Sequence, residues 1–548
     1  MHICPFILSH PSSKLFFLKQ PTPRSFSRQL PAATTRLLQH DTMAKRKRQA
    51  VAQSEPAPEP VSNKKAKAVQ APKEKPSKEK ASTPAVSTTT TTASTSPETI
   101  QIVVGSYDRI LHGLTVTIGP KDQADFADTF LFNAHTSAIR CVATSPVSAP
   151  VAGQTQNVML ASGSTDERIN LYSLSAHPPS RMDQDLLAKV APRPILENPK
   201  NREIGTLLHH SSTVTALRFP NRSKLLSSSE DSTIAVTRTR DWSLLSNIKA
   251  PIPKPQGRPS GDTAPLGGTP SGVNDFAIHP SMKLMISVSK GERAMRLWNL
   301  VTGKKAGVLN FSKEMLQEAG EGKHSTGEGR RVVWGNVDDA DEFAVGFDRD
   351  IVVFGMDSVP KCRVMGSIRS KIHQFSYVQV DEEADITLLA AATEDGRILF
   401  FSTKDEDLTK PDDADDKKSE SLPTAKLVGQ IGGKADGVDG RIKDFVVIKS
   451  ATDASRMYVA GGSSDGRVRL WRVSADELQG KKKKQAKKGD AADAAAGVGK
   501  LLGTYETRNR ITCMTAFLMI PRPEGAEESE YEFSDEEDEE EESDGDED

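Results

Sequence analysis

Seven acidic residues lie in short turns, each between two segments in which apolar residues alternate with others. A carboxylate in such a turn accepts hydrogen bonds from backbone amides and from nearby side chains. His135 and His210 each come four residues before a predicted first strand, at Ile139 and Val214, and Trp298 and Trp471 each follow a turn acid by six residues. The pattern predicts structural carboxylates that hold neighbouring loops together, with the two histidines as partners. The seven acids are Asp108, Asp166, Asp231, Glu292, Asp348, Asp395 and Asp465.

The residue patterns of common catalytic and metal sites are absent from the sequence. It has no GxSxG nucleophile elbow, no GxxxxGK[ST] phosphate loop and no HExxH zinc motif. Cys4, Cys141, Cys362 and Cys513 lie far apart, and no pair has the spacing of a zinc site. His279, in the run IHP, is interpreted as a turn residue rather than a catalytic base. We therefore expect no catalytic activity, no metal and no cofactor.

A lysine-rich segment is a candidate for binding phosphate groups. Six positive charges fall within eight residues, on Lys481, Lys482, Lys483, Lys484, Lys487 and Lys488. They would hold RNA phosphates through counterion release, without sequence selectivity. A solvated or nuclear-targeting loop is an alternative that stays open. Base-specific recognition is not supported, because no RNP-type aromatic signature accompanies the lysines.

The elements that must position the turn acids form a repeat between residues 100 and 517. Around Asp166, the alternating runs Val158–Ala161 and Ile169–Tyr172 predict a β-hairpin with the acid in its turn. A short first strand precedes each hairpin in the circular order, and a further strand follows most hairpins. Seven units of about four strands predict an all-β fold, a seven-bladed WD40 β-propeller. Pro-, Gly- or charge-rich loops lengthen the units, at 176–202, 251–271, 312–330, 403–424 and 474–499.

The two ends of the repeat region predict that the ring closes on itself. The chain enters at Ile100–Val104 with a hairpin that has no first strand before it. It leaves at Ile511–Phe517, a first strand with no hairpin after it. Pairing the two completes one blade and removes two exposed sheet edges, which would otherwise promote aggregation. The other predicted first strands are Ile139–Ala143, Val214–Phe219, Val273–Ile278, Arg331–Trp334, Ile372–Tyr377 and Ile442–Val447.

Composition divides the chain into three parts: a basic tail over 1–98, the ring over 99–518 and an acidic tail over 519–548. The net charge of −2 hides a strong asymmetry, because residues 44–98 carry +6 whereas 524–548 hold 17 Asp and Glu with no Lys or Arg. We expect both tails to be disordered, since segments so polar cannot bury enough apolar area to fold. The 36% apolar content of the whole chain is consistent with this expectation.

The basic tail carries two clusters that resemble nuclear-targeting signals. Their residues are Lys45, Arg46, Lys47, Arg48, Lys64, Lys65 and Lys67. Residues 1–42 have two interpretations: a mitochondrial-type presequence, or an extension upstream of a start at Met43. We favour the second, because a basic cluster directly follows Met43. The low cysteine count fits a reducing compartment, and no run of 18 apolar residues exists to span a membrane.

Several runs resemble the PAK-interacting, or Mak-type, family of WD40 proteins. They are GSYDRILHGL, FNAHTSAIRCVATSP, LASGSTDERINLYSL, EIGTLLHHSSTVTALRF, DFAIHPSMKLMISVSKGERAMRLWNLVTGK and VVWGN, in this order along the chain. The resemblance covers residues 100–400 well and weakens towards 517. The sequence departs from the family pattern in the loop 251–271 and in the insertions 176–202 and 474–499, so contacts made by those loops do not carry over.

The resemblance implies a non-catalytic scaffold in the nucleus and nucleolus that supports assembly of the large ribosomal subunit. Such a factor docks on pre-ribosomal particle proteins and acts as a monomer within a complex. Its basic loops would contact precursor rRNA. The family is also named for restraining a p21-activated protein kinase, so a kinase-regulating adaptor is the second hypothesis. An enzyme or ubiquitin-ligase substrate receptor on the same ring is the third.

Overall fold

The computed structural model describes the central part of the chain, with short gaps, and the described residues belong to one compact unit, Thr90–Asp548. The predicted disordered tails, except for 97–98 and 519–521, the nuclear-targeting clusters from Lys45 to Lys67 and the lysine run from Lys481 to Lys488 lie outside the described residues. The described ranges are 97–119, 121–150, 155–179, 195–196, 198, 200–253, 270–322, 325–366, 368, 370–381, 385–410, 421–479 and 497–521.

The strands form seven four-stranded antiparallel sheets, which we number as blades 1 to 7. Blade 1 contains β28 (Ile511–Leu518), β1 (Glu98–Ser106), β2 (Ile110–Ile118) and β3 (Ala124–Asn133). Blade 2 contains β4 (Ile139–Thr144), β5 (Asn157–Ser164), β6 (Ile169–Ser175) and β7 (Arg202–Leu207). Blade 3 contains β8 (Val214–Asn221), β9 (Lys224–Ser229), β10 (Thr233–Arg238) and β11 (Leu244–Lys249).

The remaining four blades repeat this order of strands. Blade 4 contains β12 (Val273–Ile278), β13 (Leu284–Ser289), β14 (Ala294–Asn299) and β15 (Lys304–Asn310). Blade 5 contains β16 (Arg331–Val337), β17 (Ala340–Gly346), β18 (Ile351–Gly355) and β19 (Pro360–Arg363). Blade 6 contains β20 (Ile372–Asp381), β21 (Ile386–Thr393), β22 (Arg397–Ser402) and β23 (Lys426–Gly432). Blade 7 contains β24 (Ile442–Lys449), β25 (Arg456–Ser463), β26 (Arg467–Ser474) and β27 (Lys500–Glu506).

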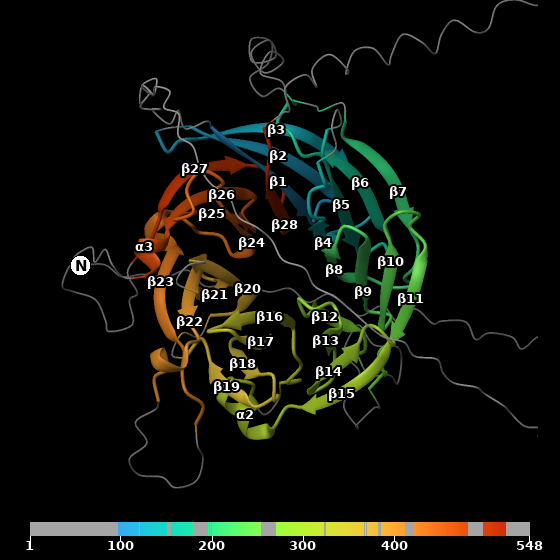
Figure 1. Ribbon diagram of the computed structural model, residues 1–548, viewed down its shortest axis with the longest axis vertical. Helices are drawn as coiled ribbons and strands as arrows, with labels where there is room; N and C mark the ends of the chain where they lie inside the picture. The colour runs from blue at the N-terminus through green and yellow to red at the C-terminus, as the bar shows by residue number, and fades with distance from the viewer. Residues whose placement is uncertain are drawn as a thin grey trace, which may run out of the picture. The chain divides into compact units, whose positions relative to one another are not determined.

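The blades are arranged as a closed ring, which confirms the predicted seven-bladed propeller (Figure 1). The first strand of each blade contacts the first strands of the blades on either side, from β28 and β4 around to β24 and β28. These strands lie innermost, and the fourth strands form the outer edge (Figure 1). Short helical segments occupy the loops: α2 (Lys313–Glu318), α3 (Ala475–Leu478), η1 (Asp405–Asp407) and η2 (Lys434–Asp436). Across the described ranges, no helix has the length and apolar character needed to cross a membrane.

The predicted closure of the ring is also confirmed. In β1, Gln101 pairs with Phe517 of β28, and Val103 pairs with Thr515. One strand from the end of the ring therefore completes a sheet whose other three strands come from its beginning. The pairing covers one edge of β1 and one edge of β28 that would otherwise be free. This is expected if ring closure avoids edge-to-edge association.

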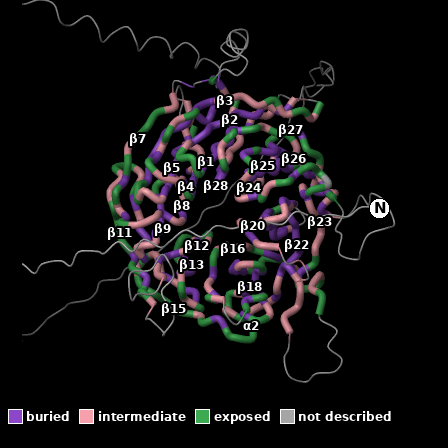
Figure 2. The backbone as a smooth tube through the Cα atoms, turned by 180° about the vertical axis from the view of Figure 1, so that it is seen from behind, coloured by how far each residue is buried: buried purple, intermediate pink, exposed green. Residues whose placement is uncertain are grey.

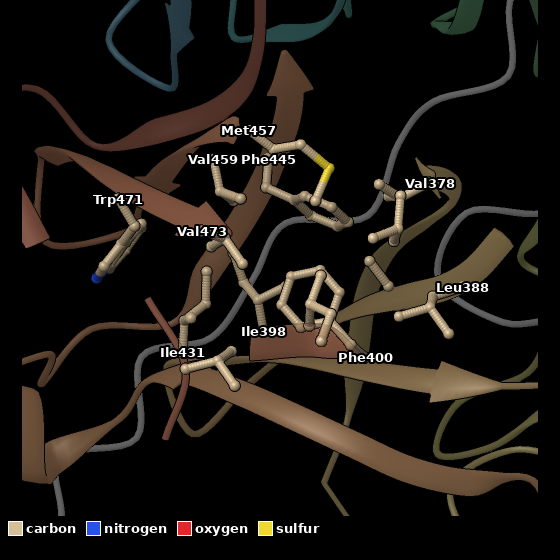
Figure 3. Packing of buried hydrophobic residues seen from close by; sticks show 14 of the residues in the cluster. Val378, Leu388, Ile398, Phe400, Ile431, Phe445, Met457, Val459, Trp471 and Val473 are labelled. Atoms are coloured by element: carbon tan, nitrogen blue, oxygen red, sulfur yellow. The ribbon is translucent and has the colours of Figure 1, made fainter. Parts of the chain in front are cut away.

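Apolar residues on the two faces of each blade pack against the neighbouring blades. Figure 3 shows one such layer, in which Ile398 and Phe400 of blade 6 point towards Val459 and Val473 of blade 7. Burying a side chain such as Phe400 fully contributes about 1.5–3 kcal/mol. Figure 2 shows burial concentrated in the inner and middle strands, whereas outer strands such as β11 and β15 are largely exposed.

A close approach of adjacent blades explains two glycines on second strands. A Cβ added to Gly105 would lie 2.7 Å from the side chain of Ile139, and one added to Gly163 would lie 2.7 Å from Val214. No real Cβ tolerates such a contact, so a larger residue would push the first strand of the next blade outward. The small residues in the motifs before the turn acids therefore set the distance between blades.

Six of the seven first strands contain a bulge near their start, where one residue is skipped in the pairing with the second strand. In β4, for example, Ile139 pairs with Ser164 and the next paired residue is Cys141. Bulges bend a strand and release the skipped residue from the regular alternation of faces. The skipped residues are Arg140, Thr215, Asn274, His373, Lys443 and Thr512.

Candidate functional site

All seven turn acids lie between the second and third strands of a blade, in the same position of the repeat. The loop that leads into a first strand lies beside these turns, because in an antiparallel sheet a first strand begins at the edge where its second strand ends. In blade 2 the turn at Asp166 is tight, and Glu167 adopts a left-handed conformation with φ of 70°. The structure thus places these acids on one face of the ring, together with the starts of the inner strands.

Asp166 fastens its turn to the loop before β4. The carboxylate accepts hydrogen bonds from His135 Nδ1 at 3.1 Å and from the backbone amide of Thr136 at 3.0 Å. His135 Nε2 in turn lies 2.8 Å from Ser162 Oγ, on the second strand of the same blade. Together these bonds join the loop, the turn and the strand, which is the structural role the sequence predicts for an acid and its histidine.

The charge states in this triad follow from burial and hydrogen bonding. Burial lowers the pKa of His135, although the charge of Asp166 opposes the effect. The pKa of Asp166 is lowered: burial raises it, but the Thr136 amide and His135 outweigh that. At neutral pH a neutral His135 therefore donates from Nδ1 to the carboxylate and accepts the Ser162 hydroxyl at Nε2.

Blade 3 repeats this arrangement with Asp231. His210 Nδ1 lies 3.2 Å from the carboxylate, while His210 Nε2 lies 2.8 Å from Ser227 Oγ. The acid also accepts from the Ser211 amide at 3.1 Å and from the Thr233 amide at 2.8 Å. The pKa of Asp231 falls to about 2, because these bonds outweigh the opposing effect of burial.

Three other turn acids pair with an arginine of the same hairpin instead of a histidine. Glu292 contacts Arg296 at 2.6 Å and Asp395 contacts Arg397 Nε at 2.8 Å. Asp465 lies 3.1 Å from Arg469. Sequence reasoning missed these partners, and the signal that would have found them is an arginine two or four residues after the acid.

Asp348 and Asp108 depart further from the histidine pattern. Asp348 pairs with Arg330 at 3.1 Å and with Lys371 at 3.0 Å, which come from the loops before β16 and β20. Asp108 accepts a hydrogen bond from the backbone amide of Arg510 at 3.1 Å. Asp108, Asp166, Asp231 and Asp348 thus bond to a loop before a first strand, whereas the partners of Glu292, Asp395 and Asp465 belong to the same hairpin as the acid.

The blade tryptophans and their substitutes lie in the layers between blades. Trp298 is buried and donates from Nε1 to Ser287 Oγ at 2.8 Å. Trp471 is buried in the layer between blades 6 and 7. In blade 2, Tyr172 occupies the corresponding position and packs against Phe132, with ring centroids 5.1 Å apart. A cavity of about 430 Å³ opens beside Tyr172 at the junction of blades 1 and 2.

The described residues offer little for catalysis. They contain no group of three or more His, Cys, Asp or Glu placed to hold a metal ion. Burial raises the pKa of the Cys141 and Cys362 thiols to about 12, so neither provides a thiolate nucleophile. His279 lies between Ser281, at 2.8 Å, and Asp341, at 3.0 Å. Its Nδ1 also accepts the Ser281 amide at 3.2 Å, which is the local geometry of a turn.

Comparisons with known proteins point to WD40 proteins. A family model described as "WD domain, G-beta repeat" matches residues 201–236, from β7 into β10. The chain is 26% identical to "Protein MAK11" of Saccharomyces cerevisiae over 405 residues, covering 69% of this chain and 78% of that protein. It is 24% identical to "p21-activated protein kinase-interacting protein 1-like" of Danio rerio over 433 residues, covering 78% and 83% respectively.

A human protein belongs to the same group of relatives. It is "p21-activated protein kinase-interacting protein 1" of Homo sapiens, 24% identical over 383 residues, with 69% of this chain and 71% of that protein covered. These matches span most of the ring rather than a single repeat. The motif runs along the chain predict the same relationship to these proteins.

Proposed function

We propose that this chain, a WD40 protein distantly homologous to MAK11 and the p21-activated-kinase-interacting proteins over most of its length, is a non-catalytic scaffold in the nucleolus. In this role it docks on pre-ribosomal particles and supports maturation of the precursor rRNA of the large subunit. WD40 propellers typically bind other proteins through the loops around a rigid ring.

The observation that carries the proposal is the extent of the match to MAK11, which reaches 78% of that protein. A match of this length includes most of the ring rather than the widespread repeat alone. Function on a propeller depends on surface loops, so a shared ring supports a shared binding role more than a shared chemistry.

The charge distribution is compatible with a ribonucleoprotein particle. The lysines from Lys481 to Lys488 supply a sequence-independent contact for precursor rRNA, and the acidic run 524–548 supplies a contact for basic ribosomal proteins. The clusters from Lys45 to Lys67 provide the nuclear address that the role requires. The chain would work as a monomer inside the complex, with no membrane contact.

Depletion of the protein tests the proposal. The expected result is a fall in the ratio of large to small ribosomal subunits, with accumulation of large-subunit precursor rRNA. Re-expression of the wild type should restore the ratio. A variant with Lys481, Lys482, Lys483 and Lys484 changed to Gln reports whether the RNA contact contributes. A normal subunit ratio after depletion would refute the scaffold role.

The names of several relatives favour a second candidate, an adaptor that restrains a p21-activated protein kinase. Co-precipitation of such a kinase, together with lower kinase activity in the presence of the purified chain, would support it. Localisation separates the two candidates: the scaffold should be enriched in the nucleolus, and the adaptor in the cytoplasm or at the cell cortex.

A further inference from the structure

The cavity of about 430 Å³ beside Tyr172 lies between blades 1 and 2, which are neighbours in the ring (Figure 1). We call it the blade 1–2 pocket. Strand β3 of blade 1 lines one side, and strand β6 of blade 2 lines the other, together with β7 and the segment before it. A cavity of this size is large enough to hold a side chain of a partner and part of its backbone. The lining side chains of interest are Phe130, Phe132, Tyr172, Asn198, Asn201 and Glu203.

Three aromatic rings follow one another along the pocket. The ring centroids of Phe130 and Phe132 are 5.2 Å apart, and those of Phe132 and Tyr172 are 5.1 Å apart. Phe130 and Tyr172 are buried, whereas Phe132 is half-buried. The face of an aromatic ring carries partial negative charge and attracts a cation. The rings therefore suit a ligand group that is both apolar in its stem and positively charged.

Glu203 adds a full negative charge beside these rings. It pairs with Tyr172 in the ladder between β6 and β7, and cross-strand partners lie on the same face of a sheet. Burial raises the pKa of Tyr172 to about 12 and the charge of Glu203 contributes, as expected for a carboxylate near the tyrosine hydroxyl. In the part of the chain that the structure describes, the Glu203 carboxylate has no ion pair and no hydrogen bond. It is therefore available to a cation from another molecule.

The neighbouring cation, Arg202, belongs to the other face of blade 2. It pairs with Ser173, one residue after Tyr172, and successive residues of a strand point to opposite faces. Tyr172 packs in the layer shared with blade 1, whereas Leu171 packs in the layer shared with blade 3. Arg202 is thus placed on the side of blade 3, and the pocket side of β7 carries the charge of Glu203.

Two asparagines supply hydrogen-bond donors at the edge of the pocket. Asn198 Oδ1 accepts the amide of Lys200 at 3.1 Å, and Asn201 Oδ1 accepts the amide of Ser175 at 2.9 Å. These bonds orient the two side-chain amides. Among the described residues, neither Nδ2 has an acceptor. An NH₂ group of this kind donates to carbonyl oxygens, such as those of a peptide backbone.

We propose that the blade 1–2 pocket binds an arginine side chain presented by a peptide segment of a partner protein. The guanidinium lies against the aromatic rings and donates to Glu203, while Asn198 and Asn201 donate to backbone carbonyls of the segment. Arginine fits better than lysine, because its flat guanidinium stacks on aromatic rings and forms two parallel bonds to a carboxylate. The proposal goes beyond the scaffold role and does not depend on it.

The test titrates the full chain with short glycine–serine peptides that have blocked ends and one variable central residue. The central residue is arginine, lysine, leucine or citrulline, which is the neutral analogue of arginine. Isothermal titration calorimetry at about 150 mM salt gives each Kd, and this salt screens binding of the single charge to the acidic run 524–548. We expect the arginine peptide to bind on the order of tenfold more tightly than the other three.

Two adjacent residues of β7 provide a matched pair of variants, each of which removes one charge. Glu203→Gln should weaken binding of the arginine peptide on the order of tenfold. Arg202→Gln, the control, should leave the affinity unchanged or raise it slightly. Phe132→Leu keeps an apolar residue but removes the aromatic face, so it should weaken the arginine peptide about threefold and leave the leucine peptide unaffected. Glu203 and Arg202 are exposed, so their variants should fold, which thermal melts check.

Several outcomes would overturn the proposal. One is equal binding of the lysine, leucine or citrulline peptide, and another is absence of binding at millimolar arginine peptide. An equal loss in Arg202→Gln and Glu203→Gln would show that the ligand is not recognised by the carboxylate. The chain's own Arg181 and Arg193 precede the edge of the pocket in the sequence. If changing both to Gln tightens peptide binding relative to the wild type, the chain itself is the occupant and the assignment to a partner is wrong. None of these results depends on ribosome assembly.

Discussion

The carboxylate of Asp231 offers a quantitative test of the turn network. Changing Asp231 to Asn keeps the size of the side chain but removes the charge that the Ser211 and Thr233 amides and His210 stabilise. Changing it to Ala also removes every acceptor atom of the carboxylate, so the Thr233 amide loses its partner and His210 Nδ1 keeps only Thr233 Oγ1, at 3.1 Å. We expect both variants to fold, because the apolar layers between blades are untouched, and to be less stable than the wild type.

The magnitude follows from the pKa. The fold lowers the pKa of Asp231 from an ordinary 3.8 to about 2. At about 1.4 kcal/mol per pH unit, this corresponds to about 2.5 kcal/mol of stability at neutral pH. For a ring of this size the Asn variant should melt about 3 °C lower than the wild type. The Ala variant should melt lower still, since the Thr233 amide then has no acceptor and an unsatisfied donor of this kind costs about 1–3 kcal/mol.

The pH dependence gives the sign of the effect. Because the folded-state pKa is below the unfolded one, the stabilisation is present in full well above pH 3.8 and is lost as the pH falls through about 2. At pH 3 it should be reduced to about half. The difference in Tm between the wild type and Asp231→Asn should therefore shrink between pH 7 and pH 3.

Thermal melts followed by circular dichroism provide the assay, with Asp241→Asn as the control. Asp241 is a half-exposed acid in the next turn of the same blade, bonded to Ser243. Its replacement should change the Tm little at either pH. A Tm difference for Asp231→Asn that matches this control, or that grows on acidification, would refute the reasoning.

Further predictions follow from other contacts. Asp166→Ala should lower the Tm more than Asp348→Ala, because Asp166 is bonded to buried His135 whereas the partners of Asp348 are solvent-exposed cations whose pairs contribute little. Gly163→Val should destabilise the ring by about 1–3 kcal/mol by forcing blades 2 and 3 apart, measured by urea unfolding, whereas Gly307→Ala, which meets no atom closer than 4.0 Å, should not. A thiol reagent should leave Cys141, Cys362 and Cys513 unlabelled in the native state by mass spectrometry, since all three are buried; rapid labelling would contradict the structure.

The number of blades and the closure of the ring could be predicted because both depend on strands in which buried apolar residues alternate with other residues. Second strands such as β5 and β13 are buried on both faces of their blades, and the tight turn from each of them to the third strand contains small and acidic residues. The unmatched strands at the two ends then determine how the ring closes. These features depend on short segments of sequence, so the same segments predict both the turn acids and the strands around them.

The outer strands are harder to recognise for a physical reason. β15 has the sequence KKAGVLN and is exposed along most of its length, and β19 has four residues. Their side chains face solvent, so the alternation that indicates a strand is weak. Their pairing comes instead from the exposed edge of the third strand, which the sequence of the fourth strand does not encode.

The partners of the turn acids determine the net charge beside each turn. Where His135 is kept, it is neutral, so the pair that it forms with Asp166 carries a charge of −1. Where an arginine is the partner instead, as with Arg469 and Asp465, the pair is neutral. A pair with arginine is therefore more positive by about one charge than a pair with a neutral histidine. The partner of a turn acid thus sets the local charge beside the turn as well as the way in which the turn is held.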